Sequence, residues 1–576
     1  MSEISRRQFT KLTVASLASG YALLNPAVPA FATTINGIEI DPAFNGGSGF
    51  FDNLINVSQF GAIPDSQNDQ SAQLQAAFDA AASSGATLVI DKVYWISPKL
   101  RSYSATESRW VGIHIPSNCK AIWIGSGAFK VLPVSDSQGG GTYYPLNFYG
   151  SQNITLYKPT VYGDRFSHLG TQGESGNNFN IVCCSNVKLF KPLSIDSWGD
   201  GYYIGLEYWG EKTNHATNIT LTAPRSVNAG RNGISLVSGQ QINILQPVNE
   251  GSPRTGPGAG IDIEFESGNN QPICSGVVID SPVSRGRTTG LLLFNAFTNA
   301  QNYAVDLDIR ITGTALDEGS GVSFAFNSYT HGNGIVYVNS LKSIGSGETP
   351  MYIEWLDHGP RLVVDYVNIQ DGNVNASAAN YGFGMHIRLQ NAPVPAYTSS
   401  GQLKSLGNFV INEFSVTDSR PQKKIFYPFK LSSVAGIPLN NVYINCLYSP
   451  SVLNPAILYT GINESCFISL YAQVVYYDLP HRLAYASELD MFATTQDGIT
   501  LKLDSTIKTA STYTKKTDNG WPIIIVAPPG QYIREGGQYF TSYSSNQYNA
   551  SISIDDVAGE KVVTSKVGTW TSTSAY

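Results

Sequence analysis

The chain has 576 residues, among them 55 glycines, 32 tyrosines and 25 phenylalanines, and only 14% of its residues are charged. This composition is typical of a β-rich protein with many turns, and the length exceeds one ordinary compact domain unless the architecture is repetitive. The formal net charge of −7 argues against nucleic acid or an anionic membrane surface as the main partner.

The N-terminus has the parts of an export signal. Residues 5–11 carry an arginine pair, an apolar stretch follows to about residue 24, and small residues end at Ala32. The arginine pair followed by Phe9 resembles the twin-arginine signal, with Thr10 where leucine is usual, and an ordinary secretory signal is the alternative. Because the apolar stretch is too short to span a bilayer, we expect cleavage after Ala32 and a periplasmic or secreted protein free of the membrane.

A strand, a helix and further strands are expected next. Residues 55–62 (Ile-Asn-Val-Ser-Gln-Phe-Gly-Ala) have the pattern of a strand that ends in a turn. Asp69 or Ser71 can cap a helix that ends at Gly85, and two strands follow over 87–96. The apolar face of the helix consists of Leu74, Ala77, Phe78 and Ala81.

A repeat with a period near 30 residues occupies the middle of the chain. Four short strands recur in it, at residues 186–189, 218–221, 243–245 and 277–279, and each precedes one of the first four glycines of the repeat. Two or three short strands per repeat are typical of a solenoid coil, whereas a propeller blade needs about 40 residues or more. The repeat glycines, each followed by alternating apolar residues, are Gly201, Gly233, Gly260, Gly290 and Gly321.

Residues 55–97 resemble the opening of the pectate-lyase-like superfamily, in which a strand ending in Phe-Gly-Ala precedes an acidic loop, an Ala-rich helix and the first coil of a right-handed β-helix. The acidic loop is thinner here, with only Asp65 and Asp69. The resemblance and the repeat imply an all-β fold: a right-handed parallel β-helix with a short N-terminal capping helix. From about residue 487 the periodicity fades and strand-like segments lie between Thr/Ser/Lys-rich turns, which predicts a small C-terminal β-module. The expected parts are a signal peptide over 1–32, a lead over 33–54, the β-helix over 55–485 and the C-terminal module over 486–576.

Candidate functional residues are sought on the outward face, because a β-helix buries its inward side chains. The richest strand covers residues 260–266, where Asp262, Glu264 and Glu266 alternate with apolar residues. These carboxylates lie roughly 6–7 Å apart along the strand, so their repulsion should raise at least one pKa. A protonated acid beside an ionised one suits glycoside hydrolysis, and the spacing lies nearer the inverting than the retaining range.

Other candidates surround the acidic strand. Asp200 precedes the same strand position two coils earlier, and Arg231 and Asn232 occupy the matching position on the coil between. Arg254, in the turn before the acidic strand, is expected to hold an acidic sugar or a carboxylate. Solvated surface, ordinary turns and structural pairing with the acids are the alternatives for these residues. The aromatic residues expected to stack on sugars, with a core role as the alternative, are Trp198 and Tyr203.

Residues 230–264 resemble a segment common in exopolysaccharide-depolymerising and tailspike-like β-helix proteins, which implies that the acidic strand lines a carbohydrate groove. We therefore expect a glycoside hydrolase that cleaves a bacterial exopolysaccharide, with Asp262 and Glu264 as acid and base and Asp200 assisting. A lyase for a uronate-containing polymer, with an arginine or calcium neutralising the carboxyl group, is one alternative. A non-catalytic carbohydrate-binding protein is the other.

The remaining expectations concern cofactors and partners. The six cysteines lack metal-ligand spacing, so neither a metal nor another cofactor is expected, with calcium left open. Most of the cysteines are expected to lie in the core, and Cys446 and Cys466 are left open as a pair on neighbouring coils. A polysaccharide is the expected partner, and a homotrimer is left open. The sequence also lacks the Asn-Thr-Asp, paired-Asp and Gly-His-Gly motifs typical of polygalacturonases, which argues against that family.

Overall fold

The computed structural model describes residues 34–35, 37–47, 49–105, 107–137, 141–206, 214–265, 272–295, 305–329, 333–356, 359–376, 382–388, 406–432, 439–448, 458–460, 468–475, 500–504, 513–514, 525–526, 549–557 and 560–568. The chain divides into two compact units, residues 1–49 and 50–576. In the first unit, β1 (Thr34–Ile35) and β2 (Ile38–Glu39) form an antiparallel pair. The predicted signal peptide and its cleavage site lie outside the described residues.

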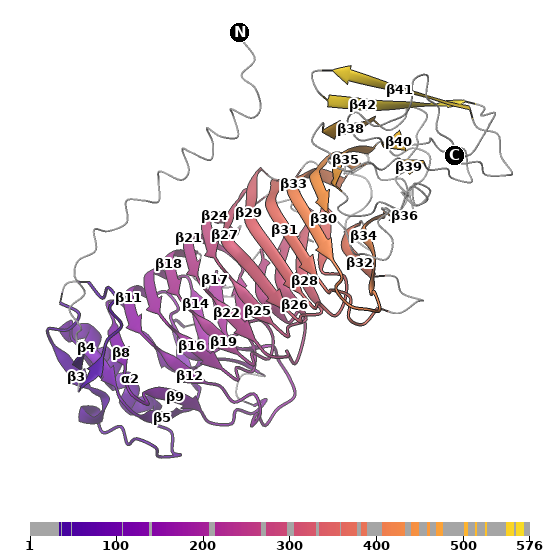
Figure 1. Cartoon of the computed structure of the whole chain (residues 1–576). Coiled ribbons are helices and arrows are strands. Elements are labelled where there is room, and N and C mark those ends of the chain that lie inside the picture. Colours follow the sequence, from indigo (N-terminus) through magenta and orange to yellow (C-terminus); the bar gives the residue numbers. More distant parts are fainter. Residues whose placement is uncertain are drawn as a thin grey trace, which may run out of the picture. The chain divides into compact units, whose positions relative to one another are not determined.

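The second unit contains a right-handed parallel β-helix built from three stacks of strands (Figure 1). The first stack opens with one antiparallel pair and then continues in parallel. Its strands are β6 (Lys99–Ser102), β7 (Ser108–His114), β10 (Thr142–Asn147), β13 (Ser175–Gly176), β14 (Phe179–Val182), β17 (Tyr202–Gly205), β20 (Ile234–Leu236), β23 (Ala259–Glu264), β26 (Thr289–Asn295), β28 (Val322–Ser328), β30 (Met351–Trp355), β32 (Gly382–Arg388), β34 (Ile425–Ser432) and β36 (Leu458–Thr460).

The other two stacks merge at β27, which pairs with both β24 and β25. The second stack consists of β3 (Leu54–Asn56), β4 (Thr87–Ile90), β8 (Lys120–Trp123), β11 (Gln152–Tyr157), β15 (Ser185–Phe190), β18 (Ala216–Thr222), β21 (Gly239–Leu245), β24 (Cys274–Asp280), β27 (Leu307–Glu318), β29 (Gly334–Ile344), β31 (Arg361–Gln370), β33 (Leu406–Thr417), β35 (Leu439–Tyr448) and β37 (Ile468–Val475). The third consists of β5 (Val93–Ile96), β9 (Ala128–Val131), β12 (Thr160–Tyr162), β16 (Leu193–Ile195), β19 (Arg225–Val227), β22 (Val248–Glu250) and β25 (Val283–Arg285).

The capping helix is α2 (Ser71–Ser84), and the face predicted for it is buried against the first coils. The helix ends at Gly85, whose φ of 70° is left-handed, and Asp69 accepts hydrogen bonds from the backbone and hydroxyl of Ser71. The strand expected over 55–62 is wrong beyond its first residues. The side chain of Asn56 accepts a hydrogen bond from the backbone of Ser58, and the chain turns into a 3-10 helix, η1 (Val57–Phe60).

The core follows from strand alternation. Inward apolar side chains of successive coils stack in register, and the buried cluster runs from Val57 to Ile425. Cys119, Cys183, Cys184 and Cys274 are buried, which confirms a core position for these four. Among the described residues, no helix is long and apolar enough to cross a membrane.

A polar seam runs through the interior beside the repeat glycines. Gly201, Gly233, Gly260 and Gly290 are register neighbours, and each packs against a seam residue of the third stack. A Cβ at Gly260 would lie 2.1 Å from the Ser284 hydroxyl oxygen, so the position requires glycine. The seam comprises Ser194, Ser226, Asn249, Ser284, Asp317 and Ser343.

The fifth repeat glycine falls outside this alignment. Thr289 pairs with Val322 and Leu291 with Phe324, so the partner of Gly290 is Ser323 rather than the predicted Gly321. The Ser323 hydroxyl group donates a hydrogen bond to Asp317 at 2.6 Å, so a seam partner replaces the glycine at this coil.

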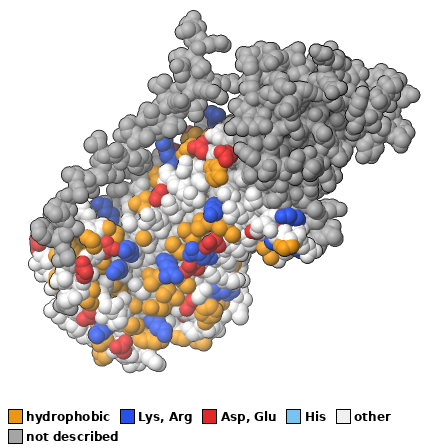
Figure 2. All heavy atoms as spheres, viewed as in Figure 1, with side chains coloured by type: hydrophobic (Ala, Val, Ile, Leu, Met, Phe, Trp, Pro, Cys, Tyr) orange, Lys and Arg blue, Asp and Glu red, His pale blue; other side chains and the backbone are white. Residues whose placement is uncertain are grey.

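Ion pairs join neighbouring coils on the outside of the third stack. Arg225 pairs with Glu250 at 2.6 Å, Glu250 with Arg285 at 2.9 Å, and Arg285 with Glu318 at 2.6 Å. Figure 2 shows acidic, basic and apolar side chains interspersed on the face that it displays. Because these side chains are largely exposed, we assign them a modest contribution to stability.

Beyond residue 499 the described strands are antiparallel. β38 (Thr500–Asp504), β42 (Glu560–Gly568) and β41 (Asn549–Val557) form one sheet, and β39 (Tyr513–Thr514) pairs with β40 (Ile525–Val526). The predicted boundary between residues 485 and 486 lies outside the described residues, so the extent of a C-terminal module stays a prediction.

Candidate functional site

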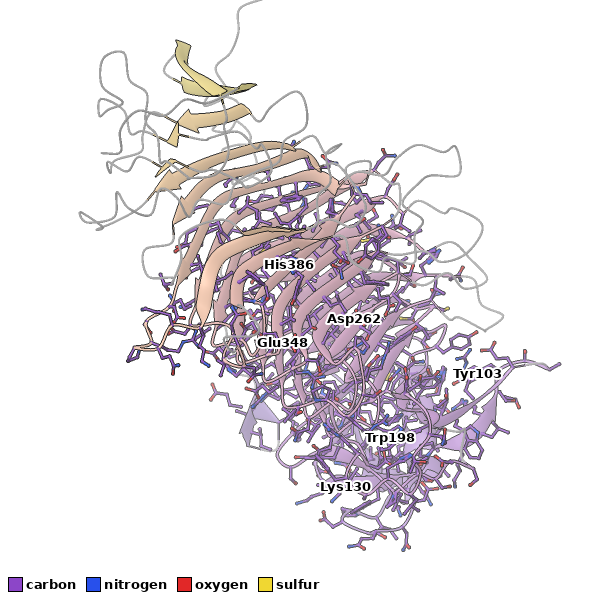
Figure 3. All side chains as sticks on the ribbon, turned by 90° about the vertical axis from the view of Figure 1, so that its right-hand side faces the viewer. Tyr103, Lys130, Trp198, Asp262, Glu348 and His386 are labelled. Carbon is purple, nitrogen blue, oxygen red and sulfur yellow. The ribbon has the colours of Figure 1, made fainter. Side chains whose placement is uncertain are left out.

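The candidate site lies on the outward face of the first stack, where β17, β20 and β23 are adjacent. Tyr203, Ser235 and Asp262 are register partners on these strands, while Ile261 and Ile263 point into the core. Figure 3 shows Asp262 on the stacked strands between the labelled Trp198 and His386. The alternation of β23 therefore directs Asp262 and Glu264 away from the core, as expected.

Asp200 is a buried hydrogen-bond acceptor at the base of this site. One carboxylate oxygen accepts the backbone N–H of Asn232 at 2.9 Å. The other accepts the hydroxyl group of Ser235 at 2.8 Å and Nη1 of Arg231 at 3.1 Å. Its side chain is fully buried, so Asp200 fixes the adjacent coil and has no surface with which to contact a polymer.

Asp262 differs from Asp200 in its hydrogen bonds. Its Oδ2 atom accepts Nδ2 of Asn232 at 2.7 Å, and its Oδ1 atom has no hydrogen-bond partner among the described residues. Asp262 is only 1% exposed, and this burial, together with the charge of Glu264, raises its pKa well above the usual range. Burial, rather than the repulsion expected from the sequence, is the main cause of this raised pKa.

Glu264 is the most accessible carboxyl group on β23. Its side chain is 30% exposed, and Nη2 of Arg231 lies 4.0 Å from its Oε2 atom. Burial raises the pKa of Glu264, the charges of Asp200 and Glu174 raise it further, and Arg231 lowers it. Glu264 therefore has both access to solvent and a raised pKa, whereas the buried side chains of Asp200 and Asp262 lack access to solvent.

Glu174 is a site residue that the sequence did not indicate. Its Oε2 atom lies 3.8 Å from Nε of Arg231, and its side chain is 62% exposed. Arg231, at 15% exposure, thus lies within 4.0 Å of the carboxylates of Asp200, Glu174 and Glu264. Glu174 stands just before the two-residue strand β13, outside the glycine-led repeat, so no periodic signal marked it.

Asn232 connects the two aspartates through its side chain. Its Nδ2 atom donates to Asp262 and to the hydroxyl group of Ser235, and its Oδ1 atom accepts the backbone N–H of Ala259 at 2.8 Å. The structure therefore brings Asp200, Asn232 and Asp262 together across three coils, although Asn232 is too deeply buried to contact substrate directly.

Arg254 and Trp198 pack on each other instead of forming an open sugar-binding surface. The Arg254 guanidinium group lies 3.7 Å from the centre of the Trp198 ring and donates a hydrogen bond to the carbonyl oxygen of Gly173. The His168 ring lies 3.8 Å from the centre of the Trp198 ring. Two groups this close must occupy opposite faces of the indole, so buried Trp198 has no free face for a sugar, contrary to our expectation.

Tyr203 and Glu266 are the two remaining residues predicted from the sequence to contact the substrate. Tyr203 is half-buried and packs against the cluster of Tyr149, Val182 and Cys183, so part of its ring serves packing. Glu266 lies outside the described residues. Within the described part of the chain, no group of three or more His, Cys, Asp or Glu side chains is arranged to hold a metal ion.

Comparison with known proteins found no matching family model and no matching curated protein. Solved structures similar to this chain include the A-module of the mannuronan C-5 epimerase AlgE4 of Azotobacter vinelandii, at 14% identity, 72% coverage of this chain, 100% of that chain and a TM-score of 0.44. The catalytic domain of Agl-KA is similar at 12% identity, with 78% and 68% coverage and a TM-score of 0.40.

A third similar structure is the tailspike protein of E. coli bacteriophage HK620 in complex with a pentasaccharide. Its identity to this chain is 11%, the coverage is 90% of this chain and 91% of the tailspike, and the TM-score is 0.34. At such low identities and TM-scores, the function of this chain has to be argued from its own residues.

Proposed function

We propose that this protein is an exported glycoside hydrolase that cleaves a bacterial exopolysaccharide, with Glu264 as the general acid. The observation that carries the proposal is the combination found at Glu264: a partly exposed carboxyl group with a raised pKa, next to Arg231. A general acid for glycoside hydrolysis must stay protonated near neutral pH and must reach the glycosidic oxygen. Among the described carboxyl groups of the site, Glu264 combines a raised pKa, which favours the protonated form, with access to solvent.

The reaction needs a second carboxyl group in its ionised form. In the proposed mechanism, Glu264 donates its proton to the glycosidic oxygen while the bond between that oxygen and the anomeric carbon breaks. Glu174 accepts a proton from a water molecule, and the water oxygen forms the new bond to the anomeric carbon. One water is consumed for each bond cleaved, and a new reducing end is released.

Asp200 and Asp262 support this pair from below. Asp200 orients Arg231 through the hydrogen bond at 3.1 Å, and buried Asp262, whose raised pKa disfavours its charged form, occupies the adjacent position. This assignment replaces Asp262 with Glu174 in the acid–base pair expected from the sequence, because an aspartate that is 1% exposed lacks access to a polymer.

The test is incubation of the exported protein with a panel of neutral and acidic bacterial exopolysaccharides. Reducing ends and the ultraviolet absorbance of unsaturated uronates are followed together, with and without a calcium chelator. We expect new reducing ends without absorbance, and a loss of about 10²–10⁴-fold in turnover for Glu264→Gln. Glu318→Gln is the matched control, because Glu318 is an exposed carboxylate of the surface ion pairs.

Other outcomes would redirect the assignment. Absorbance that rises with cleavage would make the protein a lyase and would shift the base and the neutralising cation to other groups. Binding of a polymer without either signal would make it a carbohydrate-binding protein. Export and a trimeric state remain predictions, to be checked by N-terminal sequencing of the exported protein and by its mass in solution.

A further inference from the structure

Arg287 is a buried arginine whose described hydrogen bonds from the guanidinium group all go to backbone carbonyl oxygens. Its Nη1 atom donates to Gly251 at 2.9 Å and to Ala229 at 3.3 Å. Its Nη2 atom donates to Ala259 at 3.3 Å and to the carbonyl oxygen of Arg231. The fork of the guanidinium group therefore holds four carbonyl oxygens from two neighbouring coils.

These carbonyl oxygens lie at the points where the chain enters the candidate site. Ala229 and Arg231 belong to the turn between β19 and β20, which presents the Arg231 side chain to the carboxylates. Ala259 is the first residue of β23, which carries Glu264. Arg287 itself stands in the next turn, between β25 and β26, so it ties its own coil to both of these segments.

A second arginine, Arg165, donates hydrogen bonds to the same turn from the other side of it. Arg165 precedes this turn in the chain, and its Nη1 atom donates to the carbonyl oxygens of Asn228 at 2.8 Å, Ser252 at 2.9 Å and Ala229 at 3.4 Å. Arg165 and Arg287, here called the arginine clamp, therefore converge on Ala229. The guanidinium groups of these two arginines therefore hold the turn that bears Arg231 from both sides.

Removing the two guanidinium groups of the clamp from water costs free energy, which their hydrogen bonds have to offset. The pKa of Arg287 is lowered to about 10, mainly by burial and also by the charge of Arg165, while the charge of Asp200 opposes the shift. Among the described residues, neither arginine donates a hydrogen bond to a carboxylate, so the backbone oxygens have to offset the cost of removing the guanidinium groups from water. Both arginines bind the turn that bears Arg231, which points to a demand for a precisely placed turn at the site.

We propose that Arg287 is a positioning residue that holds the Arg231 turn so that the Arg231 guanidinium group stays between Asp200 and Glu264; its catalytic consequence rests on the proposed function. Lysine has a single ammonium group and cannot reproduce a fork that reaches four oxygens on two coils. The clamp thus acts on Glu264 through Arg231.

The consequence for Glu264 has a defined sign. The charged groups that act on it are Arg231, which lowers its pKa, and Asp200 and Glu174, which raise it. Neighbouring Asp262 has a raised pKa itself, which disfavours its charged form. Displacement of Arg231 removes the lowering influence and leaves the other two. The pKa of Glu264 then rises, and the alkaline limb of the activity profile, which reports loss of the acid proton, moves to higher pH.

The experiment compares Arg287→Met and Arg287→Lys in the full chain with the control Arg285→Met, whose arginine is an exposed member of the surface ion pairs. Hydrogen exchange of peptides covering 225–236 and 257–264 is measured against a distant peptide in β31. For Arg287→Met we expect faster exchange in the first two peptides alone, turnover lower by about 10- to 100-fold, and an alkaline limb at higher pH.

Each outcome decides between the alternatives. Arg287→Lys, which keeps the charge, is expected to retain the fold and show the same local exchange in weaker form. Unchanged exchange at the Arg231 turn in a folded variant, or equal acceleration in all peptides, would overturn the positioning role. Local exchange without hydrolysis by the parent protein on any substrate would uphold the clamp and reject the hydrolase.

Discussion

Two buried aspartates lie on either side of Asn232 and illustrate how hydrogen bonding decides the role of a residue. Asp200 accepts three hydrogen bonds, one of them from Arg231, whereas Asp262 accepts one and leaves Oδ1 without a partner among the described residues. Both have the same side chain and both are buried. Their amide variants should therefore behave in opposite ways.

Asp262→Asn should change the free energy of unfolding at pH 7 by no more than about 1 kcal/mol, because an amide has the shape of the carboxyl group and burial disfavours the carboxylate form. As the pH rises, ionisation of buried Asp262 destabilises the parent protein, so the variant gains relative stability in alkaline solution. Asp200→Asn should lower the free energy of unfolding by about 2–4 kcal/mol, because an acceptor for Arg231 is lost.

Chemical denaturation at two pH values checks this contrast, and activity adds a second criterion. If Asp262→Asn abolishes hydrolysis while it leaves the free energy of unfolding unchanged, the proposal that Glu264 and Glu174 form the acid–base pair is wrong. The reaction would then use Asp262 directly, as the sequence first indicated.

At the scale of the element, the repeat glycines set how closely two stacks approach. Strands β17, β20, β23 and β26 of the first stack meet the third stack along the polar seam, and a side chain at their glycines would collide with it. The acidic strand β23 begins beside such a contact, at Gly260. The glycine that revealed the repeat thus also positions the strand that carries Glu264.

Gly260→Ala should lower the free energy of unfolding by about 1–3 kcal/mol or more. The added Cβ would lie 2.1 Å from the Ser284 hydroxyl oxygen and 2.5 Å from the carbonyl oxygen of Gly290, and a backbone oxygen has little room to move. Gly256→Ala is the matched control, because an added Cβ there meets no atom within 4 Å. Equal stability of the two variants in denaturant titrations would show that the seam yields to the extra methyl group.

At the scale of the whole molecule, the polar seam crosses coil after coil and carries one acid among serines and an asparagine. Asp317 is buried between the seam residues Ser284 and Ser343, and it accepts hydrogen bonds from Ser320 and Ser323. Burial raises its pKa to about 6, although both hydroxyl groups oppose the shift. The folded state therefore binds this proton more tightly than the unfolded chain does.

Because the pKa of Asp317 is raised on folding, its contribution to stability is complete at low pH and is lost as the pH rises through about 6. Asp317→Ser introduces the residue found at this position of the neighbouring coils. Its free energy of unfolding should therefore rise relative to that of the parent protein between pH 4 and pH 8, by up to about 3 kcal/mol. Thermal melting across that range is the measurement, with Asp308→Asn, which alters an exposed carboxylate, as the control. A difference in stability that does not change with pH would show that Asp317 is not the titrating group.

The sequence by itself determined the β-helix, the span and buried face of the capping helix, the two strands after that helix and the proximity of the acids to Arg231 and Asn232. These features follow from local alternation and from a regular repeat, since register partners can be counted along the chain. The same counting misplaced Gly321, because a coil of slightly different length shifts the register by two residues.

Only the tertiary structure decided which acids reach the surface. Burial depends on turns from other coils that lie over a strand, and no spacing rule describes how those turns pack. The turns bury Asp200 and Asp262, bring exposed Glu174 beside Arg231, and place Arg254 on Trp198. For the same reason Arg287 had no signal in the sequence: its partners are backbone oxygens, which every residue type carries, and only folding brings four of them to one guanidinium group.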